Sequence, residues 1–120
     1  MQHGILAGQV VLVVEDDQVI AQSICKALEY AGAEVTCTIL PAVTALIKQR
    51  MPSALVLDCH PVSGERRVLI RRLRHHRLPY LFDSSEPPGG VTTERNAPFI
   101  PKPCPPEIIV AAVRYLLGRL

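Results

Sequence analysis

Acidic side chains gather at the ends of apolar runs in this sequence, and one lysine follows a similar run. Glu15, Asp16 and Asp17 directly follow VVLVV, and Asp58 directly follows ALVL. Lys102 comes two residues after the short run PFI. Two unit charges about 4 Å apart repel by about 4 kcal/mol at an effective dielectric constant of 20. A hard divalent cation with oxygen ligands would remove that repulsion, so these residue types indicate a cation site if the chain brings them together.

The elements that must position these residues alternate between strand and helix. Short β-branched or apolar runs predict strands at 9–14, 34–40, 54–57, 80–83 and 99–100. Apolar residues at helical spacing predict helices at 18–31, 41–50 and 66–76, and a last helix that begins at 106. This alternation favours an α/β fold with a parallel sheet and helices on both faces. In such sheets, sites form beyond the carboxyl ends of the strands, where the polar residues above would meet.

Local signals define two of the helices more closely. Asp17 is placed to cap the N-terminus of the first helix, and Gly32 to end it. In the helix at 66–76 we expect Val68, Leu69 and Leu73 to be buried and the arginines to face outwards.

Composition and charge bound the class of protein. The chain has 120 residues, 48% of them hydrophobic and 20% charged, which is typical of one globular domain (1–120, core about 9–118). No apolar run is long enough to span a bilayer, and no targeting segment is apparent. Four cysteines without a C-x-x-C pair favour unpaired thiols in a reducing compartment, so we expect a cytoplasmic protein. They are Cys25, Cys37, Cys59 and Cys104.

Four segments in order make the chain resemble a receiver domain of a two-component response regulator. They are VVLVVEDD, ALVLD, the hydroxyl residue Ser84 after the fourth strand, and FIPKP. The resemblance spans about residues 9–118 and implies a flavodoxin-like, five-stranded parallel sheet of order 2-1-3-4-5. It also implies that Asp58 accepts a phosphoryl group from a histidine kinase or a phosphotransfer protein. Such a domain is a signalling module rather than a turnover enzyme, and it switches the binding of an output partner.

The resemblance also assigns roles in a magnesium site. Mg²⁺ would be held by Asp16, by Asp58 and by the backbone carbonyl of His60, with Glu15 acting through a bound water. Ser84 and Lys102 would stabilise the phosphoryl oxygens, and the Lys102–Pro103 bond would be cis. Ser84 and Phe99 match the positions of the family's switch residues; for Phe99, a purely structural role in the core is an equal alternative.

The sequence departs from the family in two places. The loop after Asp58 is short, with Pro61 and Gly64 closer than usual, and VSGERR and LFDSSEP look like degenerate versions of segments in compact stand-alone receivers. Asp83 and Glu86 are extra acids beside the site that would tune it, and Asp83 is expected to weaken phosphoryl retention. The helix between the fourth and fifth strands falls on 86–96, led by PPGG, so we expect it to be short or disordered. The chain reads as a natural single-domain regulator or, equally, as a receiver from a longer protein.

Three other functions compete with this reading. The odd loop and Asp83 would suit a non-phosphorylated pseudo-receiver that acts as a protein-docking module. An aspartate-nucleophile phosphatase needs a D-x-D pair, whereas the acids here are contiguous. The basic segment RRVLIRRLRHHR could bind nucleic acid or an acidic partner, but the net charge is only +2 and no aromatic residues interrupt the segment, so a solvated helix face is favoured.

Overall fold

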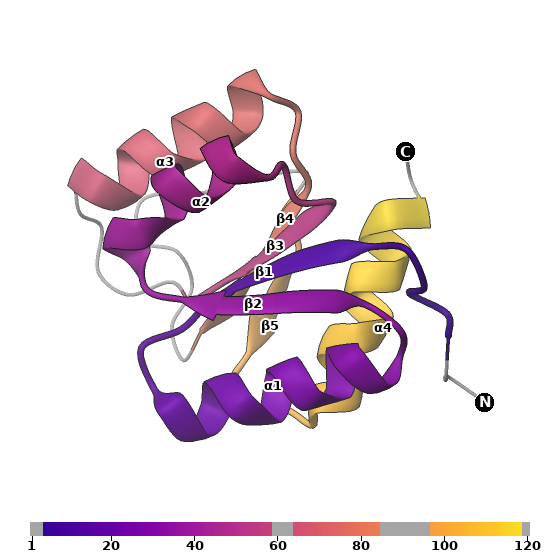
Figure 1. Ribbon diagram of the computed structural model, residues 1–120. Helices are drawn as coiled ribbons and strands as arrows, with labels where there is room; N and C mark the ends of the chain where they lie inside the picture. The colour runs from indigo at the N-terminus through magenta and orange to yellow at the C-terminus, as the bar shows by residue number, and fades with distance from the viewer. Residues whose placement is uncertain (1–3, 59–63, 85–96, 119–120) are drawn as a thin grey trace.

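The computed structural model describes residues 4–58, 64–84 and 97–118 of the chain. These residues form five strands, four α-helices and one 3₁₀ turn, and helices separate all successive strands except β4 and β5 (Figure 1). The strands are β1 (Val10–Val14), β2 (Glu34–Thr38), β3 (Ala54–Leu57), β4 (Tyr80–Ser84) and β5 (Phe99–Pro101). The helices are α1 (Gln18–Tyr30), α2 (Val43–Gln49), α3 (Gly64–His75) and α4 (Pro106–Gly118), and the 3₁₀ turn η1 is Leu40–Ala42.

The strands form one parallel sheet of order β2-β1-β3-β4-β5, which confirms the predicted fold class. Helices α1 and α4 cover one face of the sheet, and α2 and α3 cover the other (Figure 1). Each face therefore has its own hydrophobic core. Successive side chains of a strand point to opposite faces, so Val11 and Val13 of β1 pack toward α1 and α4, whereas Leu12 and Val14 pack toward α2 and α3.

The first helix begins and ends where the sequence predicts. The Asp17 carboxylate accepts hydrogen bonds from the backbone N–H groups of Val19 (3.0 Å) and Ile20 (3.2 Å), two donors that have no partner within the helix. After the last helical residue, Gly32 adopts a φ of +102°, and an added Cβ there would approach the backbone of Ala7 at 3.1 Å. Glycine is thus required at this turn by both its conformation and its close contact.

Replacement of Asp17 by alanine is expected to lower the free energy of unfolding by about 1 kcal/mol, because the two N–H groups lose their acceptor. Denaturant unfolding would measure the loss. Asp17→Asn is the matched control, since asparagine also caps helices well and should keep most of the stability. Equal losses in both variants would show that the charge of Asp17 matters rather than its hydrogen bonds.

The buried face of α3 differs from the prediction. Leu69 and Leu73 are buried as expected, but Val68 is 54% exposed and Arg66 is buried at 6% exposure. The buried stripe runs through positions 66, 69, 70 and 73, which follow the helical spacing i, i+3, i+4, i+7, and Val68 lies outside it. Burial of an arginine is tolerated here because its guanidinium lies over the ring of Phe82, 5.4 Å from the centroid.

The expected state of the cysteines is wrong for one pair. Cys25 of α1 and Cys37 of β2 form a disulfide, with their Cα atoms 7.0 Å apart. On β2, Cys37 points to the same face as Val35, the face that α1 covers, so the two sulfur atoms meet although their spacing matches no motif. Cys104 is a free thiol.

The remaining differences concern element ends. The second strand stops at Thr38, and Pro41 lies in η1 rather than opening an α-helix.

The segment 86–96, for which a short or disordered helix is predicted, lies outside the described residues. Within the residues that the structure describes, no helix combines the length and the apolar character needed to cross a membrane.

Candidate functional site

The sheet itself brings the acidic residues together. Glu15 follows β1, and its N–H donates to the carbonyl of Thr38 at the end of β2 (3.1 Å). Asp58 follows β3, and its N–H donates to the carbonyl of Val14 (2.9 Å). The ladder of β1 and β3 therefore continues one step past the strands. This step places Glu15 and Asp58 side by side at the carboxyl edge of the sheet.

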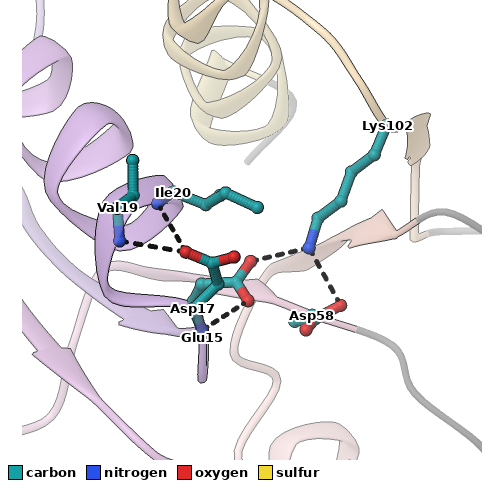
Figure 2. Close-up of polar contacts among 6 residues, drawn as sticks. All are labelled: Glu15, Asp17, Val19, Ile20, Asp58 and Lys102. Carbon is teal, nitrogen blue, oxygen red and sulfur yellow. Dashed lines mark hydrogen bonds and ion pairs between the residues drawn. The ribbon is translucent and has the colours of Figure 1, made fainter.

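Lys102 completes this cluster and directly follows the edge strand β5. Its Nζ lies 2.7 Å from Oε1 of Glu15 and 3.2 Å from Oδ1 of Asp58, so one ammonium group bridges two carboxylates (Figure 2). The Lys102–Pro103 bond is cis, as expected. The three side chains are largely shielded from solvent, with exposures of 16% for Lys102, 3% for Glu15 and 5% for Asp58. The close approach of Lys102 to Asp58, on which the functional reading depends, is confirmed.

The three consecutive acids have three different environments. Glu15 is buried; besides Lys102, it accepts a hydrogen bond from the N–H of Asp17 at 3.2 Å. Asp17 caps α1, and Asp16 is exposed to solvent. The repulsion between Glu15 and Asp17 is eased because each carboxylate accepts hydrogen bonds from different groups. Glu15 contacts Lys102, whereas the Asp17 carboxylate is directed to the start of α1 (Figure 2).

The electrostatics of the cluster follow from its burial. Burial raises the pKa of Glu15 above its ordinary value, and the hydrogen bond from Lys102 offsets this only in part. For Lys102, burial would lower the pKa, but the carboxylates of Glu15 and Asp58 outweigh it and raise the pKa above the ordinary value. The lysine is thus held in its charged form. A charged lysine among oxygens can stabilise additional negative charge that arrives at this edge.

A further acid, Asp83, lies near the cluster. Asp83 belongs to β4, where it pairs in register with Ile100 of β5, and it is 2% exposed. Burial raises its pKa; the charge of Lys102 opposes this and that of Asp58 adds to it. The sequence predicts an acid at this edge but gives no sign that it is buried.

For the other predicted site residues, the structure gives a position in the sheet or core, or they lie outside the described part of the chain. Ser84 is the last residue of β4 and pairs in register with Pro101, directly before Lys102. Phe99 is half-buried and packs against the core under α2 and α3. His60 and Glu86 lie outside the described residues. The predicted phosphoryl-binding, switch and tuning roles of these residues stay predictions.

The carboxylate oxygens at this edge of the sheet are ligands of the kind that a hard divalent cation prefers. Glu15, Asp16 and Asp58 supply carboxylate oxygens at one edge of the sheet, and Mg²⁺ is bound in proteins through one or two carboxylates with several waters. In the part of the chain that the structure describes, no three such side chains are already grouped as a metal site. A cation would therefore complete its shell with water and with groups beyond these side chains.

Comparison with solved structures identifies the fold. The response regulator PhyR from Brucella abortus superposes with a TM-score of 0.79 at 22% identity over 98% of this chain. A response regulator receiver protein from Burkholderia phymatum gives 0.75 at 21% identity, covering 92% of this chain and 95% of that one. The receiver domain of a Francisella response regulator gives 0.72 at 23% identity, covering 93% and 98%. The chain has the receiver fold.

The same comparisons set limits on length and sequence. This chain spans about half of the Brucella protein (50%), whereas it spans nearly all of the Francisella receiver domain. No family model matches the sequence, and no curated protein matches it. The likeness therefore rests on architecture, at identities of 21–23% for these three structures.

Proposed function

We propose that this chain is a phosphoacceptor receiver domain of a two-component or phosphorelay system. Asp58 accepts the phosphoryl group, and the donor is a histidine kinase or a phosphotransfer protein. The observation that carries the proposal is the bridge from Lys102 Nζ to Glu15 and Asp58 at the carboxyl edge of a receiver-type sheet. This edge is where ligands bind in doubly wound folds.

The reaction transfers a phosphoryl group from a phosphohistidine donor to the carboxylate of Asp58. A carboxylate oxygen of Asp58 forms a bond to phosphorus, while the bond from phosphorus to the donor's imidazole nitrogen breaks and the electron pair of that bond stays on the imidazole. The charge on the phosphoryl oxygens must be balanced at once. Lys102 supplies one positive charge that is already in place, and the Ser84 hydroxyl is the proposed second partner.

The protein's own carboxylates explain why a metal would be needed. Asp58 is the nucleophile, and its neighbour Glu15 would repel an incoming phosphoryl group. Mg²⁺, when bound, supplies the further positive charge that neutralises the phosphoryl oxygens. Asp16, Asp58 and the backbone carbonyl of His60 would hold it, with Glu15 acting through water. Glu15 also fixes the lysine, which keeps the ammonium from folding away from Asp58.

Phosphorylation by a small donor tests the proposal directly. Incubation of the full chain with acetyl phosphate and Mg²⁺ should add the mass of one phosphoryl group, as measured by intact-protein mass spectrometry. Addition of EDTA should prevent the gain. The competing function is a pseudo-receiver that docks a protein without phosphorylation, which the buried acid Asp83 favours. A chain that gains no mass at any donor concentration would support that alternative.

A further inference from the structure

Asp83 is an acid in an apolar position of the sheet. Along β4, Leu81 points to the core under α1 and α4 and Phe82 to the core under α2 and α3, so Asp83 points to the side of Leu81. Its register partner Ile100 packs on the same core. Among the described residues, the Oδ1 atom of Asp83 is buried and has no hydrogen-bond partner. One oxygen of the carboxyl group is therefore removed from solvent without a hydrogen bond to replace it.

Such an arrangement costs stability. A buried acceptor without a partner typically costs about 1–3 kcal/mol, and an apolar residue at this position would fit the surrounding side chains better. Residues that break a local rule in this way are expected at functional sites rather than in purely structural ones. Asp83 accordingly needs an explanation from its charge rather than from its packing.

The charge of Asp83 reaches the phosphorylation site. Leu57 of β3 pairs in register with Phe82 of β4, so the residues that follow them, Asp58 and Asp83, lie on neighbouring strands at the same level of the sheet. Burial raises the pKa of Asp83; the charge of Lys102 opposes this shift and that of Asp58 adds to it. Burial at 2% exposure removes most of the solvent between these groups. Electrostatic interactions that run through protein rather than water are screened little by salt.

We infer that Asp83 is an electrostatic tuning residue that disfavours phosphorylation of Asp58 and strengthens cation binding at the unphosphorylated site. The inference rests on the proposed function. The Asp58 carboxylate carries one negative charge, whereas a phosphoryl group at neutral pH brings about 1.5 to 2. The fixed negative charge of Asp83 repels the added charge and competes for Lys102. The same negative charge attracts a divalent cation.

The two effects have opposite signs, and this makes the test specific. In Asp83→Asn, Mg²⁺ affinity measured by calorimetry without a phosphodonor should fall about threefold. The ratio of phosphorylated to unphosphorylated protein in acetyl phosphate at saturating Mg²⁺ should rise about threefold or more. Both quantities are measured at mildly alkaline pH. The pKa of Asp83 is raised by burial, and a higher pH favours its ionised form. Glu29→Gln removes an exposed charge at the far end of α1 and should change neither quantity.

A second variant guards against a folding defect. Asp83→Val removes the same charge, fills the apolar position and should shift both quantities as Asp83→Asn does. A parallel fall in Mg²⁺ affinity and phosphorylation in both variants would indicate a merely structural role and overturn the inference. No change in either quantity would also overturn it while leaving the proposed function intact. Wild-type protein that gains no phosphoryl group would refute the proposed function itself, and this inference with it.

Discussion

Replacement of Asp58 by asparagine is expected to abolish the Mg²⁺-dependent gain of a phosphoryl group from acetyl phosphate. An amide cannot act as the nucleophile at phosphorus under these conditions, because it has no anionic oxygen. The loss should be complete rather than partial, since the other carboxylates near the cluster are placed differently. Glu15 is held by Lys102 and by the N–H of Asp17, and Asp83 is almost completely buried in the sheet.

The control is a matched substitution nearby. Asp17→Asn removes an exposed carboxylate from the same edge of the sheet but keeps the helix cap, so the mass gain should persist. Asparagine at position 58 retains the shape of the side chain, and thermal unfolding should show a folded protein. Retention of the mass gain in Asp58→Asn would place the acceptor elsewhere. Peptide mapping of the modified residue would then identify it.

The two central strands β1 and β3 could be predicted from the sequence because they are short and largely buried on both faces, whereas the strand order came from the resemblance to receiver domains. The run ALVL at 54–57 contains no polar residue, which is typical of a strand covered on both faces. Its predicted bounds agree with those of β3. The polar residues stand at the strand ends. The rule for parallel sheets then places them at one edge without any knowledge of side-chain contacts.

Side-chain orientation was harder to predict where residues of mixed character share a helix. In α3, five arginines suggest an all-basic outer face, yet the helical spacing of Leu69, Ile70 and Leu73 carries Arg66 inwards. The aromatic ring of Phe82 that receives it belongs to a strand 16 positions away. Contacts of this kind depend on tertiary packing, which local patterns do not contain.

The disulfide shows the same limit at longer range. Cys25 and Cys37 are 12 residues apart in sequence, a spacing that matches no motif. They meet because α1 crosses the face of β2 to which Cys37 points, a consequence of the connection between the two elements. The pairing of Lys102 with Glu15 was likewise unexpected, because the resemblance assigned Glu15 to a metal-bound water. In the structure, the lysine fills part of the role that a cation would have.

This pairing gives the second large prediction: Lys102→Met should lower the free energy of unfolding by about 3 kcal/mol at neutral pH in EDTA. Removal of one partner of a buried ion pair leaves the other charge unpaired, which is typically strongly destabilising. Here two carboxylates, Glu15 and Asp58, would lose their shared counter-ion while staying nearly buried. Methionine preserves most of the length and the apolar part of the lysine side chain. Denaturant unfolding of both proteins measures the difference.

The pH dependence should separate loss of charge from loss of packing. Because the folded-state pKa of Lys102 is raised, its contribution in the wild type is fully present below the ordinary value of 10.5 and is lost as pH rises through the raised pKa. The variant should lack this alkaline loss. In the variant, Glu15 has a pKa raised by burial with no lysine to oppose it, so its protonated form is favoured by folding. The stability difference should therefore shrink as pH falls below neutrality.

Mg²⁺ and a control lysine complete the argument. A divalent cation can replace the missing ammonium charge, so saturating Mg²⁺ should stabilise Lys102→Met more than the wild type. Lys26→Met removes an exposed lysine from α1 and should change stability by no more than about 0.5 kcal/mol. If Lys102→Met matched the wild type at every pH, the ammonium would not be holding the carboxylates together. In that case, the ion pairs of Lys102 with Glu15 and Asp58 would not prepare this edge of the sheet for added negative charge.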